Sequence, residues 1–303
     1  MSENPKLSIA VCTRNREDVL PKCLESLVNQ TASSGLFEVL IVDNNSTDDT
    51  KKIALDFCEK HSNFKYVFEE KQGHSQARNR AIAEANGKYL AYIDDDAIAD
   101  GKWVESILDC FSQTDADAVG GPVQPFIETD KDSPFFYDVR SHKFDCGNER
   151  KRMLPPGFDF GFSTCNVCFK RSLFNEVGLF SENFGIVNGK LQMGEDSEMG
   201  YRLLKAGKVF YYEPGMKVNH KLRLKELEFI GSLKRSYNVG AGIGKIIKND
   251  ITLSKKLKKI AAPFVYSVLF SFLFPFYWIK GPWFFAKKLK DVFFAFGVAR
   301  NVL

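Results

Sequence analysis

The sequence predicts an α/β protein with a mostly parallel sheet, followed by a helical extension. Three observations lead to this prediction. Short apolar runs alternate with helical stretches through residues 1–220, as in strands joined by helices. One apolar run, Tyr89–Ile93, continues directly into three carboxylates, Asp94–Asp96. Residues 221–303 form a contrasting segment that is rich in basic and aromatic residues.

The first part of the chain contains the clearest alternation. We expect strands at Leu7–Cys12, Phe37–Val42, Lys65–Phe68 and Tyr89–Ile93, and helices at Leu20–Val28, Thr50–Lys60 and His74–Asn86. Asn, Ser, Thr and Asp residues at 44–49 form a turn that caps the second of these helices. Further strands are expected at Ala118–Val123 and Val209–Tyr212, and a helix that starts near Asp196 and ends at Gly207.

The three consecutive carboxylates are the main chemical signal. Like charges this close repel one another, and burial disfavours each of them. A divalent cation at the end of the strand would neutralise them, and hard oxygen ligands suit Mg²⁺ or Mn²⁺. Asp43 ends another expected strand, so one ligand could contact both strand ends. A solvated acidic turn is the plainer alternative.

Charge is distributed unevenly along the chain. Residues 221–303 contain 16 Lys and Arg against 4 Asp and Glu, a balance of +12, whereas residues 1–220 have a balance of −8. Two surfaces with different partners are therefore expected. The seven cysteines do not suggest a disulfide framework, and Met1–Pro5 shows no secretory signal, so we expect a reducing cytoplasmic compartment.

Four motifs, in order, resemble those of the family 2 glycosyltransferases, which have the GT-A fold. They are Val11–Asn15, Ile41–Asp48, Ala77–Ala81 and Tyr92–Ala97. Two later segments, Phe162–Arg171 and Gly194–Gly207, continue the resemblance, which covers residues 6–220. The Gln-x-x-Arg-Trp motif of the family's processive synthases does not occur in the sequence, which favours a non-processive enzyme.

The resemblance implies transfer of a sugar from a UDP- or GDP-linked donor to an acceptor hydroxyl, with inversion at the anomeric carbon. It implies Mn²⁺ or Mg²⁺ as cofactor, held by Asp94, Asp96 and His220. Asp196 would be the general base. The expected substrate-binding residues are Thr13, Asn15, Asp43, Arg78, Asp95 and Glu195.

Several of these residues have plainer alternative roles. His220 could be structural, Arg78 an ordinary charge on a helix surface, and Asp43 a turn residue that caps a helix. Glu195 and Asp196 could simply favour the dipole of a helix in its first turn. A structural zinc site is a further alternative, and its ligands would be His142, Cys146, Cys165 and Cys168.

The basic tail predicts membrane association. Ile260–Ile279 is a run of twenty uncharged residues, long enough to span a bilayer, although Pro263 and Pro275 are expected to interrupt it. Lys221–Lys259 is expected to be helical but interrupted at Gly240, Gly242 and Gly244. The mixture of basic and aromatic residues suits an anionic membrane better than nucleic acid. We expect an interfacial or partly inserted hairpin, with a hairpin buried on the catalytic domain as the alternative.

The sequence therefore predicts a catalytic domain at residues 1–220 and a membrane-associated tail at 221–303. The expected enzyme acts at the cytoplasmic face of the cell membrane on a saccharide or lipid-linked acceptor, in polysaccharide or glycolipid assembly. A nucleotidyltransferase is one rival, but its Gly-rich phosphate loop has no counterpart at Val11–Arg16. A non-catalytic membrane-bound scaffold is the other rival, and it would not need Asp196.

Overall fold

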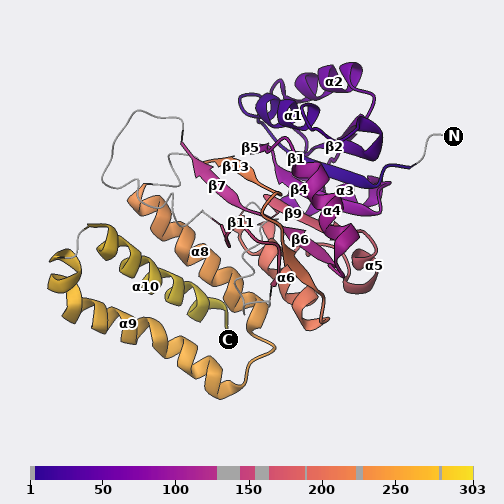
Figure 1. Ribbon diagram of the computed structural model, residues 1–303. Helices are drawn as coiled ribbons and strands as arrows, with labels where there is room; N and C mark the ends of the chain where they lie inside the picture. Colours follow the sequence, from indigo (N-terminus) through magenta and orange to yellow (C-terminus); the bar gives the residue numbers. More distant parts are fainter. Residues whose placement is uncertain are drawn as a thin grey trace. The chain divides into compact units, whose positions relative to one another are not determined.

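The computed structural model describes residues 4–127, 144–153, 164–187, 190–222, 228–279 and 282–302 (Figure 1). The chain divides into two compact units. The first contains Met1–Pro125, His142–Glu182 and Met199–Lys221, and the second contains Phe126–Ser141, Asn183–Glu198 and Leu222–Leu303.

An eight-stranded sheet forms the centre of the first unit, with the strand order β3-β2-β1-β4-β9-β6-β12-β8. The first four strands in this order are parallel, as is the β6–β12 pair, whereas β9 and β8 run antiparallel to their neighbours. This confirms the predicted mostly parallel α/β fold. The strands are β1 (Leu7–Thr13), β2 (Phe37–Asp43), β3 (Phe64–Phe68), β4 (Tyr89–Asp94), β6 (Ala118–Gly120), β8 (Lys151–Met153), β9 (Asn166–Lys170) and β12 (Phe210–Tyr212).

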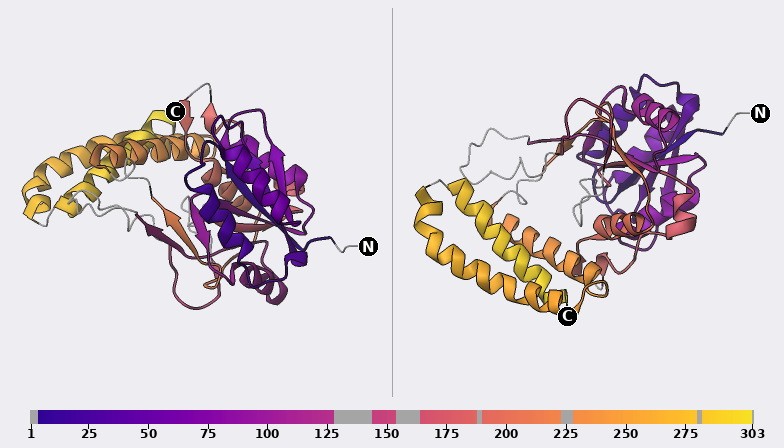
Figure 2. Two further views of the ribbon diagram at one scale, coloured as in Figure 1. Left: turned by 90° about the horizontal axis from the view of Figure 1, so that it is seen from above. Right: turned by 60° about the horizontal axis from the view of Figure 1, so that its bottom comes forward.

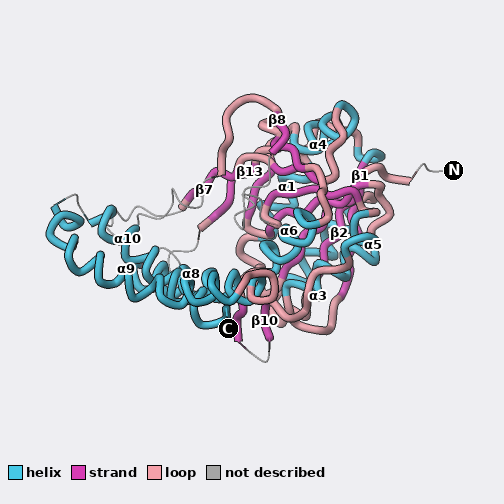
Figure 3. The backbone as a smooth tube through the Cα atoms, turned by 90° about the horizontal axis from the view of Figure 1, so that it is seen from below, coloured by secondary structure: helices cyan, strands magenta, loops and turns pink. Residues whose placement is uncertain are grey.

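Helices cover both faces of this sheet (Figures 1 and 3). One face packs on α1 (Leu20–Val28), α2 (Thr50–Lys60) and α4 (Trp103–Gln113). The other face packs on α3 (His74–Glu84), α5 (Leu173–Val177) and α6 (Glu195–Lys205). Alternate strand residues supply the two cores: Ile9 and Val11 face the first set of helices, and Ala10 faces the second. Period-two alternation in buried strands thus builds a three-layer arrangement.

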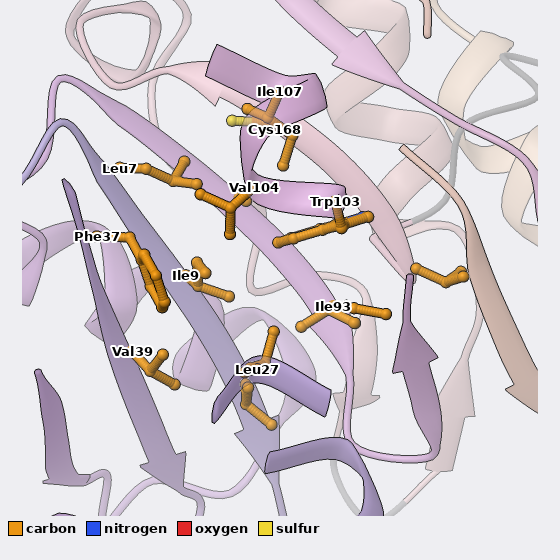
Figure 4. Close-up of a cluster of buried hydrophobic side chains, with 14 of the residues drawn as sticks. Leu7, Ile9, Leu27, Phe37, Val39, Ile93, Trp103, Val104, Ile107 and Cys168 are labelled. Atoms are coloured by element: carbon orange, nitrogen blue, oxygen red, sulfur yellow. The ribbon is translucent and has the colours of Figure 1, made fainter. Parts of the chain in front are cut away.

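The core beneath the end of β4 is held by a buried polar clamp. Figure 4 shows Ile93 of β4 and Trp103 of α4 within this core. The Trp103 ring nitrogen donates to Asn166 Oδ1 at 2.9 Å. Asn166 Nδ2 in turn donates to the carbonyl oxygens of Pro122 and Met216. The hydrogen-bonding groups of this buried amide are therefore used to fix β9 against two loops.

A second, three-stranded sheet was not predicted from the sequence. It has the order β5-β13-β7 and contains β5 (Ala97–Ala99), β13 (Val218–Lys221) and β7 (Val123–Phe126). The single strand expected at Ala118–Val123 is wrong, because β6 and β7 belong to different sheets. The chain turns between them at Gly121, where a Cβ atom would lie 1.9 Å from the Met216 carbonyl oxygen.

The second unit contains three long helices, α8 (Phe229–Ile247), α9 (Leu253–Ile279) and α10 (Pro282–Val302), and a small hairpin of β10 (Gly185–Val187) and β11 (Lys190–Gln192). Helix α10 lies between α8 and α9 (Figures 1 and 2). Aromatic pairs Phe264–Phe296 and Phe274–Phe285 show that α9 and α10 run antiparallel.

The predicted interruption of the basic stretch by glycines is wrong. Gly240 and Gly244 lie inside α8, where added Cβ atoms would lie 2.1 Å from the Phe294 carbonyl oxygen and 2.5 Å from that of Val298. Gly297 of α10 has the same close approach to Tyr237. These glycines therefore allow the backbones of α8 and α10 to pack in contact, as small residues do in other close helix pairs.

Pro263 and Pro275 do not interrupt the apolar segment either, because both lie inside α9. Over Leu253–Tyr277 the helix is long and apolar enough to cross a membrane, and only 6% of its most apolar stretch is buried. Its exposed side chains include Phe264 and Phe272, the latter 80% accessible. An apolar face this exposed is available to contact a membrane or another protein.

Candidate active site

The site begins where three parallel strands end at one edge of the sheet. Thr13 at the end of β1 pairs with Asp43 at the end of β2, and Cys12 pairs with Asp94 at the end of β4. The carboxyl ends of parallel strands are where ligands bind in open α/β sheets. The strand register therefore brings Thr13, Asp43 and the Asp94–Asp96 segment to the same end of the sheet.

Asp43 is buried and held from two sides. Its Oδ1 accepts a hydrogen bond from the Ser46 backbone N–H at 2.9 Å, and its Oδ2 accepts one from the Tyr66 hydroxyl at 2.8 Å. Burial, followed by the bond to Asp43, raises the pKa of Tyr66 well above its usual value, so this phenol stays protonated and donates. A carboxylate has about four lone-pair sites, so these two bonds leave acceptor capacity for a ligand.

Asn15, expected to bind substrate, is used to join two loops. Its Oδ1 accepts from the Thr47 backbone N–H at 2.8 Å, and its own N–H donates to Ser46 Oγ. Its φ of 52° is in the left-handed region, which Asn tolerates better than most residues. The structure thus connects the β1 loop to the β2 loop through Asn15.

Arg16 is a site residue that the sequence analysis missed. Its Nη2 lies 2.9 Å from Asp96 Oδ2, and its Nε lies 3.4 Å from Asp95 Oδ1. Arg16 belongs to the Thr13–Arg16 loop, but only the pairing of β1 with β4 places it against carboxylates eighty positions later. An Arg closely following a strand end is thus a weak signal until the strand order is known.

His220 lies against the acidic cluster. It pairs with Ala97 across the β13–β5 ladder, and this places its Nε2 3.0 Å from Asp96 Oδ1 and 3.7 Å from Asp94 Oδ2. The backbone N–H of Lys221 also donates to the Asp96 carbonyl oxygen at 2.9 Å. The short second sheet is therefore what brings residue 220 to the end of β4.

Burial and neighbouring charges shift the pKa values of Asp95 and Asp96 in opposite directions. Burial dominates at Asp95 and raises its pKa to about 7, against the opposing charge of Arg16. Burial also acts to raise the pKa of Asp96, but the hydrogen bond and charge of His220, together with Arg16, outweigh it and leave the pKa below its usual value. Adjacent carboxylates with divergent pKa values are typical of functional sites.

The residues at this edge fit a divalent cation. Asp94, Cys165 and His220 each offer a ligand atom, and these atoms lie within 4.8 Å of one another. Carboxylate and imidazole donors suit first-row divalent metals. Within the described part of the chain, this group does not include Cys146 or Cys168 of the alternative zinc set. The fourth member of that set, His142, lies outside the described residues.

Arg78 is buried, which excludes the alternative of an ordinary surface charge. The residue is 7% exposed, its Nη2 donates to Thr164 Oγ1, and its guanidinium carbon lies 5.6 Å from the centroid of the Phe180 ring. Burial raises the pKa of Cys12 to about 12. The positive charge of Arg78 acts to lower this pKa, and the negative charge of Asp94 acts to raise it. The Arg78 guanidinium therefore lies near the end of β4, where the three carboxylates follow.

Glu195 and Asp196 belong to the second unit, in the first turn of α6. Gly194 precedes them with a φ of 122°, and its N–H donates to Glu195 Oε2 at 3.2 Å. Behind Gly194, Gly242 of α8 lies so close that a Cβ on it would be 2.1 Å from the Met193 carbonyl oxygen. Helix α8 thus packs directly on the segment that leads into this acidic turn.

Solved structures share the fold of this chain. A mannosyltransferase from Pyrobaculum calidifontis in complex with GDP-Man and Mn²⁺ aligns with a TM-score of 0.61 at 16% identity, over 99% of this chain and 74% of that one. Residues 1–349 of S. aureus TarS, in complex with UDP, align with a TM-score of 0.57 at 17% identity, over 97% of this chain and 91% of that one. Both likenesses support the GT-A fold.

Curated relatives agree in class. A β-1,3-glucosyltransferase of Campylobacter jejuni, named for the acceptor GalNAc(5)-diNAcBac-PP-undecaprenol, is 25% identical over 83% of this chain and 77% of its own length. Of three other glycosyltransferase relatives, this chain spans only 40%, 48% and 52%. The model of glycosyl transferase family 2 matches residues 8–178, which contain β1, β2, β4 and the three consecutive carboxylates. The chain therefore belongs to glycosyltransferase family 2.

Proposed function

We propose that this protein is an inverting, non-processive glycosyltransferase that moves a sugar from a UDP- or GDP-linked donor to an acceptor hydroxyl. The observation that carries the proposal is the convergence of Asp94, Asp96 and His220 at the strand edge beside Thr13 and Asp43, in a chain of family 2. The mannosyltransferase neighbour, crystallised with GDP-Man and Mn²⁺, supports a donor and a metal of this kind.

In this proposal the nucleoside binds at the ends of β1 and β2. Asp43 accepts hydrogen bonds from the ribose or base, and buried Thr13 borders the same position. Asp95 contacts the ribose. Asn15 and Ser46 hold the two loops that frame this part of the site. The site is formed by rigid strand ends, so little conformational entropy is lost when the donor binds.

The diphosphate binds at the acidic edge, where Mn²⁺ or Mg²⁺ held by Asp94, Asp96 and His220 would stabilise the charge that develops on the leaving group. Arg78 adds a permanent positive charge from α3, and a guanidinium suits paired phosphate oxygens. Arg16 forms ion pairs with Asp95 and Asp96, so it neutralises part of the carboxylate charge that the metal ion leaves uncompensated.

Asp196 is proposed as the general base. It accepts the proton of the acceptor hydroxyl as the oxygen attacks the anomeric carbon, which breaks the bond to the diphosphate and inverts the configuration. Glu195, next to it, is proposed to bind the acceptor. Both lie in the first turn of α6, where the helix dipole favours carboxylate charge.

We propose that the acceptor is a lipid-linked or cell-surface saccharide, and that α9 and α10 hold the enzyme at the cytoplasmic face of the membrane. Support comes from the exposed apolar face of α9 and from the four lysines near its start, which suit an anionic bilayer. The Campylobacter relative, whose named acceptor is linked to undecaprenol, supports an acceptor of this kind. An enzyme that uses such an acceptor would take part in polysaccharide or glycolipid assembly.

The test is a donor screen with the purified full-length protein. UDP- and GDP-sugars are incubated with Mn²⁺ or Mg²⁺, and the released nucleotide is measured with and without a polyprenyl-phosphate saccharide. One donor should release UDP or GDP, and the anomeric configuration of the product, read by NMR, should be inverted. Release of pyrophosphate would indicate a nucleotidyltransferase instead, and no release from any donor would contradict the proposal.

A further inference from the structure

Cys165 lies beside the proposed metal ligands for a reason that the strand register explains. It directly precedes β9, which pairs antiparallel with β4 so that Asn166 lies opposite Ile93. One step further along this ladder, Cys165 meets the end of β4 at Asp94. The same step carries Cys165 towards His220, since its sulfur, an Asp94 oxygen and a His220 nitrogen all lie within 4.8 Å of one another.

These separations suit a shared ion. In a tetrahedral site with metal–ligand distances of about 2.0–2.3 Å, the ligand atoms lie roughly 3.3–3.7 Å apart. The three donor atoms, which lie within 4.8 Å of one another, need to move together by at most about 1.5 Å to bind the same cation. Cys165 is only 3% exposed, whereas the Asp94 side chain is 40% exposed, so the cluster has a buried sulfur side and an open oxygen side.

We propose that Cys165 is a ligand of the metal at this site, as a thiolate beside Asp94 and His220. The inference rests on the metal dependence proposed above, and it adds which metal ions the site prefers. Sulfur is a soft donor that favours Zn²⁺ or Co²⁺, whereas Mg²⁺ prefers an all-oxygen shell. The thiolate thus biases the site away from Mg²⁺, and the thiol proton is released to solvent when the ion binds.

The residues next to Cys165 allow a role as metal ligand to be distinguished from simple packing. Asn166 already fixes the start of β9 through its bonds to Trp103, Pro122 and Met216. Cys168 is equally buried on the same strand but lies opposite Ala91, away from the acidic edge. Cys168 is therefore a matched control: both thiols are buried in β9 or at its start, and only Cys165 belongs to the cluster.

The test uses Co²⁺ as an optical probe of the full-length, reduced protein. Wild type and Cys168→Ala should bind Co²⁺ with visible ligand-field bands and a sulfur-to-cobalt charge-transfer band in the near ultraviolet. Cys165→Ser and Cys165→Ala should lose the charge-transfer band. Since losing an outer partner of a metal ligand already costs about 10–100-fold in affinity, losing the sulfur should weaken Co²⁺ binding at least about 10-fold.

The outcomes distinguish the two proposals. If wild type binds Co²⁺ without a charge-transfer band, Cys165 is not a ligand and the metal site stands. If wild type does not bind Co²⁺, Mn²⁺ or Mg²⁺ by calorimetry, with or without UDP and GDP, the metal dependence itself is wrong. Cobalt-edge X-ray absorption of wild type, which needs no variant, should show a sulfur neighbour even if the Cys165 variants fail to fold, and its absence would overturn the inference.

Discussion

Asp96 carries a contact on each of its carboxylate oxygens, His220 on one and Arg16 on the other. Replacing it with Ala removes the charge that would hold a cation at the diphosphate, and no neutral group nearby can supply it. We expect Asp96→Ala to lose the increase in donor affinity that Mn²⁺ gives. Titration of the donor by calorimetry, with and without Mn²⁺, measures this.

The matched control for that titration is Asp56→Asn, which removes a carboxylate from the exposed surface of α2. It should keep the metal-dependent affinity of wild type. Equal metal dependence in Asp96→Ala and wild type would remove Asp96 from the set of metal ligands.

Asp196 lies in an acidic turn with Glu195 and Glu198, so its role must be separated from that of its neighbours. Asp196→Asn is nearly isosteric but does not accept a proton, and a positioned general base is typically worth about 10²–10⁴ in rate. We expect the variant to bind donor normally and to lose transfer by a factor in that range. Steady-state turnover at saturating acceptor is the measurement.

Glu198→Gln is the control in the same turn, because it makes the same kind of change two positions later. It should keep most of the turnover. Wild-type turnover in Asp196→Asn would transfer the assignment of base to Glu195, for which Glu195→Gln is then the decisive variant.

Some of these residues can be predicted from the sequence, whereas others cannot, because strand pairing between distant positions brings them to the site. Three acids that follow an apolar run already indicate Asp94–Asp96, since such a cluster needs a counter-charge. Arg16 and Cys165 give no such signal, because their importance comes from strand pairings that join distant positions. His220 was predicted by resemblance, but only the ladder between β13 and β5 explains its position.

At the scale of elements, the glycines of α8 illustrate the limit of local propensity. Glycine weakens an isolated helix by about 1 kcal/mol relative to alanine, so the sequence alone suggests a break. The helix continues because α10 approaches these positions so closely that a side chain would collide with its backbone. Packing that is absent from the local sequence therefore overrides the propensity.

Helix propensity and packing predict opposite effects of Gly240→Ala on stability, so an unfolding experiment can distinguish them. If Gly240 were merely flexible, Gly240→Ala would stabilise α8 by about 1 kcal/mol. A Cβ there would instead lie 2.1 Å from the Phe294 carbonyl oxygen, and overpacking typically costs about 1–3 kcal/mol. We expect the unfolding midpoint of Gly240→Ala in urea to fall, as read by circular dichroism.

Asn238→Ala, two residues earlier in α8, serves as the control for helix propensity, because it adds the better helix former without adding an atom next to α10. It should leave the midpoint unchanged or raise it. A higher midpoint in Gly240→Ala than in wild type would show that the close helix contact does not determine stability here.

At the scale of the whole molecule, the order of strands and helices up to the end of β4 at Asp94 follows the sequence closely, because apolar residues recur with a clear period in these segments. The short strands β5, β7 and β13 could not be predicted, because three or four residues carry too little pattern. The assignment of residues 183–198 to the second unit was also hidden, since it depends on contacts such as Gly242 with Met193.

The second unit also determines where the whole enzyme is expected to act. Helix α9 exposes apolar side chains over most of its length and begins with Lys255, Lys256, Lys258 and Lys259. Each basic residue near an anionic surface contributes about 1 kcal/mol, so four together contribute on the order of 4 kcal/mol. We expect the full-length protein to float with phosphatidylglycerol-containing liposomes at low salt and less at high salt.

Two variants separate the electrostatic and apolar parts of this binding. Replacing the four lysines with Gln should remove most of the salt-dependent flotation, while Phe272→Asp should weaken flotation at every salt concentration, because Phe272 is 80% exposed and a charge there opposes insertion. Neither change alters the site at the end of β4, so hydrolysis of a soluble donor should persist in both variants. Full-length protein that stays in the soluble fraction with anionic liposomes at low salt would contradict the membrane proposal, and the exposed face of α9 would then be assigned to a protein interface.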